Sequence, residues 1–337
     1  MLKQCSQLSF DDVWLEPQYS EITSRVIPDL SSNLSDYCKL RHPVLATNMA
    51  SVVGPAMAKT FDTSGSLAFH HRFLDQDTLC GYAKDFIESD SSIFAFSAGI
   101  QDTDLETAKK IFDIVGEKGV ILIDIAHAHT KMMGVFLGKI KAVGFKTLVV
   151  GNVATSDGYE FLSDHGADAV RVGIAGGRVC TTKYVTGHHV PTLQSVIDVA
   201  IWRQTKKYKP AIIADGGISC SGDAAKAIAA GADFVSVGSI LASTSDSPSD
   251  LLQDPSGKLY KLHYGMSSRT ALDKFFDGKK THVAPEGKTE KILYSGETDF
   301  VLNEFLSGIK SSLSYSGAKN IAEFQKKAIL RYAVRGK

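Results

Sequence analysis

The sequence predicts an α/β protein that folds as a single (β/α)8 barrel, the TIM-barrel architecture. Eight short apolar and β-branched runs alternate along the chain with segments of helical periodicity. This alternation indicates parallel strands joined by right-handed crossovers, and eight such units within roughly 200 residues match the length of a closed barrel. An open, doubly wound sheet is the alternative, because short apolar strands are easily miscounted in one sequence.

The predicted elements follow one another from residue 44 to the C-terminal region. We expect strands at residues 44–49, 66–70, 93–98, 120–125, 147–150, 167–174, 211–214 and 234–241. Helical periodicity is clearest at residues 105–115, 132–142, 158–165 and 193–202. Residues 265–296 are polar and interrupted by glycine, and we expect them to form a mobile catalytic lid after the eighth strand. Helices at residues 297–312 and 319–329 should cover the outside of the barrel, so that residues 1–337 form one domain.

The composition narrows the class of protein. The 337 residues are 44% hydrophobic, and the 37 Lys and Arg balance the 37 Asp and Glu. This neutrality gives no support for nucleic-acid or membrane binding, and no stretch resembles a leader or a membrane span. The cysteines are scattered without metal-ligand spacing, which favours a reducing, cytoplasmic location. They are Cys5, Cys38, Cys80, Cys180 and Cys220.

A glycine-rich loop that contains Cys180 follows the sixth predicted strand. The loop reads Gly-Ile-Ala-Gly-Gly-Arg-Val-Cys-Thr-Thr, and loops at strand ends carry the chemistry of barrel enzymes. Backbone amides and the Arg178 cation would favour the thiolate form of Cys180, which we expect to act as a nucleophile. The alternative is a buried structural cysteine, because free cysteine is among the most buried residue types. The neighbouring glycines and threonine hydroxyls favour the nucleophile.

The last two predicted strands end in what we interpret as a phosphate site. Gly216 and Gly217 follow the seventh strand, and Gly238 and Ser239 end the eighth. Glycine lets backbone amides approach an anion closely, and barrels commonly bind phosphate at this pair of loops. Asp215 could hold the two hydroxyls of a ribose, although a helix-capping or loop acid is the simpler reading of this residue alone. Together these residues predict a nucleoside monophosphate as ligand.

Five motifs in this order resemble those of the IMP dehydrogenase and GMP reductase family. They are Gly-Gly-Arg-Val-Cys-Thr-Thr-Lys (176–183), Ala-Asp-Gly-Gly-Ile (214–218), Val-Gly-Ser (237–239), Tyr-Gly-Met-Ser-Ser (264–268) and Glu-Gly-Lys-Thr (286–289). The likeness extends from Phe10 to Ala318, which is nearly the whole chain. It adds support for the barrel that the alternation of elements predicts.

The resemblance is closer to the reductase branch of this family. Dehydrogenases of the family usually carry a regulatory insertion after the second strand, whereas here His70-His71-Arg72 leads directly into the next helix. Their lid holds an Arg-Tyr pair that activates water, whereas residues 266–290 contain one arginine, Arg269, and no tyrosine. Asn48 followed by Met49 also resembles the reductase pattern. A dehydrogenase without the insertion and a nucleotide-binding homologue without catalytic activity remain as alternatives.

The resemblance implies NADPH-dependent reductive deamination of GMP to IMP and ammonia. Cys180 would attack purine C2 to form a covalent adduct, and Thr182 with Glu286 would protonate the departing amine, because an unprotonated amide ion is too basic to leave. The implied nucleotide-binding residues are Asp215, Gly216, Gly217, Gly238, Ser239, Tyr264, Gly265, Met266, Ser267 and Gly287. The implied NADPH-binding residues are Asn48, His71, Asp124, Ala126 and His127. The family also suggests a homotetramer and a K⁺ ion on the backbone carbonyls of Ala175, Gly177 and Cys180.

Five positions depart from the common reductase pattern. Ala50 stands where an Asp is usual, His71 where a Lys is frequent, and Val283 where an Arg often precedes the lid glutamate. In the cysteine loop, Ala175 and Arg178 replace a Gly and a Ser. Because several of these positions lie near the expected cofactor, the preference between NADPH and NADH is less determined than the covalent chemistry. His127 and His129 are spaced like metal ligands but lack a third ligand nearby, so we interpret them as cofactor-site or rim residues.

Overall fold

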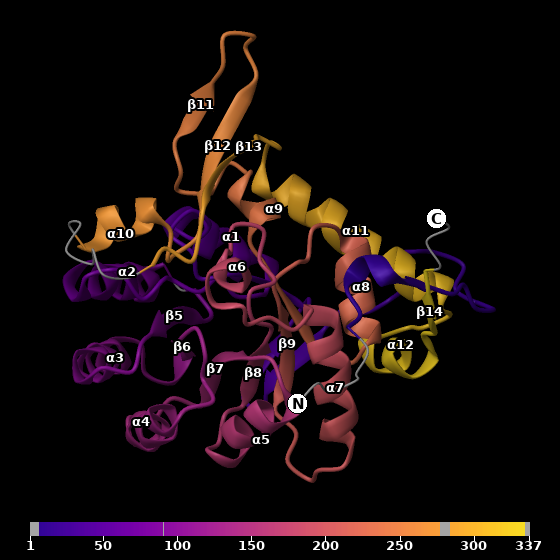
Figure 1. Cartoon of the computed structure of the whole chain (residues 1–337), viewed down its shortest axis with the longest axis horizontal. Helices are drawn as coiled ribbons and strands as arrows, with labels where there is room; N and C mark the ends of the chain where they lie inside the picture. Colours follow the sequence, from indigo (N-terminus) through magenta and orange to yellow (C-terminus); the bar gives the residue numbers. More distant parts are fainter. Residues whose placement is uncertain (1–6, 90, 277–283, 334–337) are drawn as a thin grey trace.

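The protein is built around a closed parallel barrel, as the computed structural model of residues 7–89, 91–276 and 284–333 shows (Figure 1). Seven strands form one parallel sheet in the order β4, β10, β9, β8, β7, β6, β5. In chain order they are β4 (Val44–Ala46), β5 (Phe94–Ala98), β6 (Gly119–Asp124), β7 (Thr147–Val153), β8 (Ala169–Val172), β9 (Ala211–Asp215) and β10 (Phe234–Val237).

Residues 66–70 supply the eighth position and close the barrel between β4 and β5. Parallel bridges join Ala68 to Ala46 and His70 to Phe96. Backbone hydrogen bonds connect the same segments, including His70 N–H to the Ala95 carbonyl (3.0 Å). The prediction of eight strands in a TIM barrel is therefore confirmed, and the open sheet is excluded.

Helices follow the strands, and most of them cover the outside of this barrel (Figure 1). Those between strands are α1 (Pro55–Ser64), α2 (Gln76–Glu88), α3 (Asp102–Val115), α4 (Lys131–Lys141), α5 (Ser156–Asp164), α6 (Thr182–Thr186), α7 (Thr192–Gln204) and α8 (Ser221–Ala229). After the last strand come α9 (Ser239–Ala242), α10 (Arg269–Phe276), α11 (Thr298–Tyr315) and α12 (Ile321–Lys327). Single 3-10 turns lie at Phe10–Asp12 and Gly116–Lys118.

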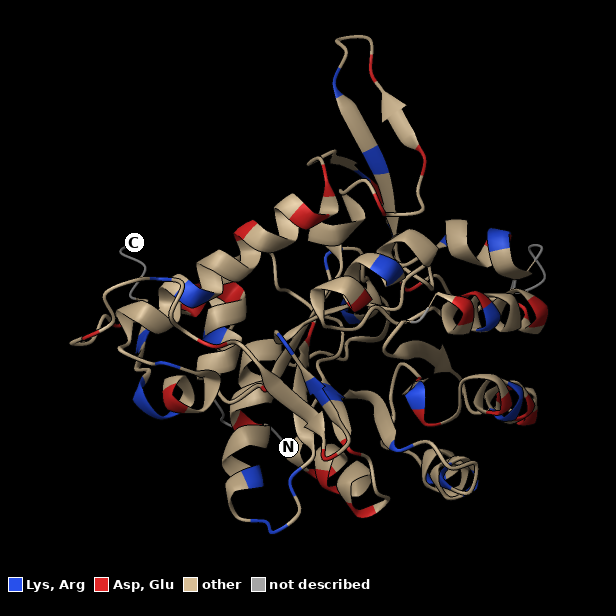
Figure 2. Ribbon diagram, turned by 180° about the vertical axis from the view of Figure 1, so that it is seen from behind, with Lys and Arg blue, Asp and Glu red and all other residues tan. Residues whose placement is uncertain are grey.

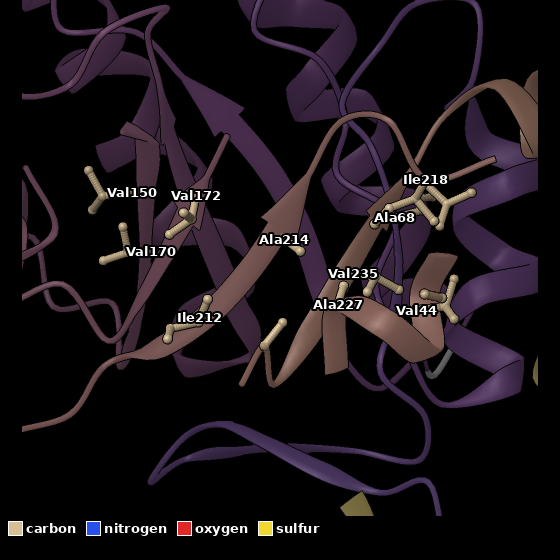
Figure 3. Close-up of a cluster of buried hydrophobic side chains, with 14 of the residues drawn as sticks. Val44, Ala68, Val150, Val170, Val172, Ile212, Ala214, Ile218, Ala227 and Val235 are labelled. Atoms are coloured by element: carbon tan, nitrogen blue, oxygen red, sulfur yellow. The ribbon is translucent and has the colours of Figure 1, made fainter. Parts of the chain in front are cut away.

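The strands bury both of their faces because side chains alternate between the barrel interior and the surrounding helices. Ile213 points inward with Phe234 and Leu122, whereas Ile212 and Ala214 join the outer cluster. Figure 3 shows part of this outer cluster, including valines from several strands together with Ile218 and Ala227. The hairpin of β2 (Ser32–Ser35) and β3 (Cys38–Leu40) adds Leu34, Cys38 and Leu40 to the interior cluster.

After the seventh strand, three features differ from the sequence prediction. The strand expected at residues 234–241 ends at Val237, because Ser239 begins α9. The region expected to be an irregular lid contains α10 and β13 (Thr289–Leu293), while its residues 277–283 lie outside the described residues. A three-stranded antiparallel sheet of β11 (Leu251–Gln253), β12 (Leu259–Tyr264) and β13 projects from the barrel and was not predicted (Figure 1).

The outer surface carries both signs of charge. In the view of Figure 2, blue and red segments are interspersed on the helices, while the barrel strands are mostly tan. Near the chain ends, β1 (Val13–Leu15) pairs antiparallel with β14 (Leu330–Tyr332). Among the described helices, none is both long enough and apolar enough to cross a membrane.

Candidate active site

A cavity of about 250 Å³ opens where the loops after the strands meet the lid region. Parallel strands present their carboxyl ends at one end of a barrel, which is where barrel enzymes keep their active sites. Residues from distant parts of the sequence meet here. Of the predicted site residues, Asn48, Asp124, Ala126, Ala175, Gly177, Cys180, Thr182, Asp215, Gly216, Gly265, Met266, Ser267 and Glu286 line the cavity.

Cys180, Thr182 and Glu286 form one continuous hydrogen-bonded relay. Cys180 Sγ donates to Thr182 Oγ1 at 3.2 Å, and Thr182 Oγ1 donates to Glu286 Oε2 at 2.7 Å. All three side chains are partly buried. A proton can therefore pass from the thiol to the carboxylate through a single hydroxyl, and this geometry suits both thiol activation and later proton donation.

The lid segment reaches the cysteine loop through backbone contacts. Thr181 N–H donates to the Glu286 carbonyl (2.8 Å), and Lys288 N–H donates to the Val179 carbonyl (2.9 Å). Between these bonds, Gly287 forms an antiparallel bridge with Cys180. A Cβ on Gly287 would lie 3.1 Å from Ser268 N and 3.2 Å from Gly265 Cα, so the close approach favours glycine, and a side chain here would push these neighbours by a few tenths of an ångström.

An ion pair adds to this connection between loop and lid. Arg178 Nε donates to Glu290 Oε2 at 2.8 Å, and Lys288 Nζ lies 2.5 Å from the other Glu290 oxygen. Hydrogen bonds from Arg178 and Lys288 lower the pKa of Glu290. Arg178, expected to favour the thiolate of Cys180, is thus engaged with β13 instead.

Arg171 joins the two sides of the cavity and was not among the predicted site residues. Its side chain is 8% exposed, and it forms ion pairs with Asp124 (3.1 Å) and with Asp215 (2.8 Å). It also donates to Asn48 Oδ1 at 2.8 Å. Burial acts to lower the pKa of Arg171, but the carboxylates of Asp215 and Asp124 outweigh it and raise that pKa above its ordinary value. The guanidinium therefore stays charged and holds both acids in place.

Asp215 is held by two donors on a single oxygen. Arg171 Nη2 and Asn152 Nδ2 both donate to Asp215 Oδ2, and Asn152 Nδ2 also contacts the Gly173 carbonyl (2.8 Å). Oδ1 accepts no hydrogen bond from the described residues, so it is left for a ligand. A fixed carboxylate with one free oxygen suits recognition of sugar hydroxyls.

Two of the three predicted phosphate glycines adopt conformations that favour glycine. Gly216 and Gly217 have φ of 97° and 81°. A Cβ on Gly216 would lie 2.9 Å from Gly177 N, so the loops after β8 and β9 touch through their backbones. Gly238 is the N-cap residue of α9, with Ser239 as the first helical residue. Only Gly216 of these four residues lines the cavity itself.

Other predicted site residues lie at or beyond the edge of the cavity. Tyr264 is 6% exposed and packs with Ala50 and Ala271, while Gly287 contacts the cysteine loop instead of the cavity. His71 does not line the cavity; its ring packs on Phe275 of α10, with centroids 5.2 Å apart. His127 is exposed, and its ring lies 6.3 Å from that of His129. Val283 and Cys5 lie outside the described residues.

The residues that the family resemblance suggests for a K⁺ site, Ala175, Gly177 and Cys180, lie in the turn of the cysteine loop. Ala175 has φ of 62°, and the Gly177 carbonyl accepts a hydrogen bond from Cys180 N–H at 3.1 Å. In the described part of the chain, no group of three or more His, Cys, Asp or Glu side chains is placed to hold a metal ion. Backbone carbonyls, which suit hard cations, are a different kind of donor.

The barrel and the relay at its mouth define a TIM-barrel enzyme. Residues 7–335 match the family model described as the IMP dehydrogenase / GMP reductase domain. The chain belongs to this family of oxidoreductases. It is 34% identical over 334 residues to GMP reductase of Aliivibrio salmonicida, a match that covers 97% of this chain and 94% of that protein.

Two further relatives agree with this assignment. GMP reductase 2 of Homo sapiens is 34% identical over 331 residues, covering 95% of this chain and 92% of that protein. A solved structure of a GMP reductase variant from Trypanosoma brucei, in complex with guanosine 5'-monophosphate, superposes with a TM-score of 0.89. That match covers 98% of this chain and 96% of the other at 21% identity, and it supports the fold.

Proposed function

We propose that this protein reduces GMP to IMP with release of ammonia, using NADPH as reductant. The observation that carries the proposal is the relay from Cys180 through Thr182 to Glu286, which faces the same cavity as Asp215. The similarity to GMP reductases over nearly the whole chain supports the same substrate. A thiol, a proton relay and a ribose-binding carboxylate in one cavity match the needs of a covalent reaction at a purine ring.

The first half of the reaction replaces the amino group of GMP by the enzyme's sulfur. The Cys180 proton passes through Thr182 to Glu286 as the sulfur forms a bond to purine C2. The bond between C2 and the amine then breaks, and the same proton returns to the amine, which leaves as neutral ammonia. One proton leaves the thiol and one reaches the amine, so this half requires no external acid.

In the second half, the bond between sulfur and C2 breaks and Cys180 is released as a thiolate. NADPH, when bound, supplies the hydride that C2 receives. The first half leaves Glu286 without its proton, so the carboxylate takes up one proton from solvent, and Thr182 can then pass it to the sulfur along the same path. Asp215, fixed by Arg171 and Asn152, keeps the ribose in one position through both halves.

The opposite side of the cavity fits a polar cofactor. Arg171 Nε is buried and has no hydrogen-bond partner in the described structure, while Asn48 and Asp124 line the same side. This nitrogen is not accessible from the cavity, so the groups here that a polar cofactor could contact are the side chains of Asn48 and Asp124. Asn48, Asp124 and Ala126 would lie beside NADPH, with His127 at the rim, whereas His71 would act only by supporting α10. The proposal also includes a preference for NADPH over NADH and a K⁺ ion bound by the backbone carbonyls of the cysteine loop. It further includes a homotetrameric assembly and a cytoplasmic location.

The two alternative functions, a dehydrogenase and a nucleotide-binding protein without catalytic activity, are less well supported than GMP reduction. A dehydrogenase would need a residue to activate water, and the described lid residues 266–276 and 284–290 contain no tyrosine. A nucleotide-binding protein without catalytic activity would have no need for a thiol, a hydroxyl and a carboxylate in direct contact.

Loss of NADPH absorbance on addition of GMP tests the proposal, with NAD reduction on addition of IMP as the contrasting assay. We expect Cys180→Ala to abolish turnover while IMP still binds, because Asp215 and its partners are unchanged. Cys220→Ala, at an exposed cysteine away from the cavity, is the matched control and should keep full activity. Substantial GMP reduction by Cys180→Ala would remove the thiol from the mechanism.

A further inference from the structure

Beside the cysteine loop, the base of the three-stranded sheet is tied to the barrel. Glu290 of β13 stands opposite His263 of β12. His263 is 2% exposed, and its Nδ1 lies 3.0 Å from the hydroxyl of Ser51, which follows β4. Ser51 Oγ also donates to the Tyr264 carbonyl and accepts from Tyr264 N–H, both at 3.3 Å. Strand β12 is therefore held on the barrel, and β13 carries Glu290 at its side.

Arg178 connects the cysteine loop to this sheet through its side chain. Its Nε donates to Glu290 Oε2 at 2.8 Å, while Lys288 Nζ lies 2.5 Å from Oε1. Each carboxylate oxygen therefore has its own cation, one from the cysteine loop and one from the lid segment. These hydrogen bonds from Arg178 and Lys288 lower the pKa of Glu290, so the carboxylate is charged near neutral pH.

The ion pair of Arg178 with Glu290 and the proton relay lie at opposite ends of one contact. Cys180 stands opposite Gly287 in an antiparallel bridge, so the loop and the lid segment run in opposite directions. Glu286 meets Thr182 at one end of this contact, and the ion pair closes the other. A shift of one residue in an antiparallel contact turns every side chain to the other face. Such a shift would carry the Glu286 carboxylate away from Thr182.

The charges make the two members of the ion pair unequal. Without Glu290, Arg178 and Lys288 would face each other across the contact as like charges, which repel. Without Arg178, Glu290 would keep Lys288 as its partner, and the attraction between loop and lid would be lost. Without both, the attraction would be lost but no repulsion would replace it. Removal of the carboxylate alone should therefore disturb the contact most.

We propose that Arg178 and Glu290 are positioning residues that hold the lid segment in register on the cysteine loop, and so keep Glu286 within reach of Thr182. This inference rests on the proposed function, which gives the relay its task. The two side chains are 59% and 25% exposed, so the effect of the pair is moderate. Exposed ion pairs shift an equilibrium by about 2- to 5-fold. The pair sets how often the relay is complete and takes no part in the chemistry.

Amide hydrogen exchange of peptides spanning residues 178–183 and 284–290 measures the opening of this contact in the free protein. Arg178→Met should speed exchange in both peptides by about 2- to 5-fold. Glu290→Gln should speed it by about 4- to 25-fold, because repulsion of similar size adds to the lost attraction. The double variant should return to the level of Arg178→Met alone. Lys291→Met, which removes an exposed cation from the same strand, is the matched control and should exchange like wild type.

Steady-state reduction of GMP by the same variants shows whether the contact serves the relay. We expect kcat to fall in the order of the exchange rates, with a smaller effect on KM for GMP, and Arg178→Lys to keep at least half of the wild-type kcat. Wild-type exchange in both single variants, or a double variant that opens as much as Glu290→Gln, would overturn the proposal. A loss confined to KM would do the same. Absence of GMP reduction by wild-type protein would contradict the proposed function, while the exchange rates would still decide whether the pair holds the contact.

Discussion

Arg171 is the residue on which both sides of the candidate active site depend. It stands between Asp124 and Asp215 in a strand whose other members, Ala169, Val170 and Val172, are fully buried and apolar. A planar guanidinium can bond two carboxylates at once, whereas an ammonium group presents a single point of charge. Removing such a cation would leave buried acids without a partner, which is costly.

We expect Arg171→Lys to fold but to bind IMP about tenfold more weakly, since hydrogen bonds to charged groups contribute roughly 1.5–3 kcal/mol. Lysine keeps the charge but cannot hold Asp124 and Asp215 together. The dissociation constant of IMP, measured by calorimetry beside a thermal unfolding curve, checks this expectation. Unchanged affinity in a folded variant would show that Asp215 does not need its guanidinium partner.

Glu286→Gln should separate the two halves of the proposed reaction. Loss of a general acid typically lowers a rate by about 10² to 10⁴, so steady-state reduction of GMP should fall by that factor. A single turnover of IMP with NADP uses the relay only to remove the thiol proton and protonates no leaving amine, so NADPH formation should be slowed much less than GMP reduction. Equal losses in both assays would mean that Glu286 organises the lid for every step.

At the scale of elements, the segment that carries Glu286, just before β13, contacts the cysteine loop through its backbone. The bonds from Thr181 to the Glu286 carbonyl and from Lys288 to the Val179 carbonyl place the carboxylate within reach of Thr182. This contact is the part of the lid that acts in the relay, and α10 and β13 are its supports on either side.

Gly287→Ala should lower kcat by up to about 10-fold, because the added Cβ requires a shift of a few tenths of an ångström and a displacement of about 1 Å at a reacting group can cost about 10² in rate. The added Cβ would press on Ser268 N and Gly265 Cα and move the segment away from Cys180. Gly138→Ala is the control: nothing lies within 4 Å of its Cβ, and alanine should stabilise α4. Steady-state kinetics of both variants provide the test, and full activity of Gly287→Ala would show that the contact tolerates displacement.

The elements of the barrel were predictable because each strand is a buried apolar run and each helix shows its own period. The end of the eighth strand was misplaced because Ser239, Ile240 and Leu241 continue the same small and apolar pattern into α9. The strand Leu251–Gln253 gave no such signal, since it is short and half-exposed. A pattern that reflects burial cannot reveal a strand that is not buried.

The candidate site was predictable only in part. Thr182 and Glu286 are 104 residues apart, so the resemblance to a family, not any local pattern, joined them. Arg171 was missed because its acidic partners lie 47 and 44 residues away in the sequence. The sequence signal for Arg171 was a single charged residue inside an apolar strand. A charge that is buried in this way requires a partner of opposite charge. The sequence gave a weaker signal for Asn152, because polar residues are common where a strand ends and a loop begins.

For the whole molecule, buried histidines set a lower limit to the pH range of stability. Burial lowers the pKa of His42, His70, His71 and His263 to about 4 each. In the unfolded chain these groups take up protons near pH 6.5. As the pH falls from about 6.5 to about 4, the unfolded state binds more protons than the folded state, so the free energy of unfolding decreases.

Urea unfolding at about pH 7, 6 and 5 should show this loss, with each imidazole contributing up to about 1.4 kcal/mol per pH unit below its unfolded pKa. The urea midpoint should fall at each step, while the dependence of the free energy on urea stays constant. A midpoint that is level or rises between about pH 6.5 and 5 would show that these imidazoles accept protons in the folded state.

The pairing of Val44 in β4 with Val235 in β10 also sets the timing of folding during synthesis. A ribosome that adds about 5–20 residues per second needs on the order of 10–40 s to make the roughly 190 residues between them. Throughout that interval, β4 leaves the ribosome with one edge that has no strand to pair with, and free edges invite association with other chains. The barrel therefore cannot close until β10 has been made, and β4 keeps an unpaired edge until that late strand arrives.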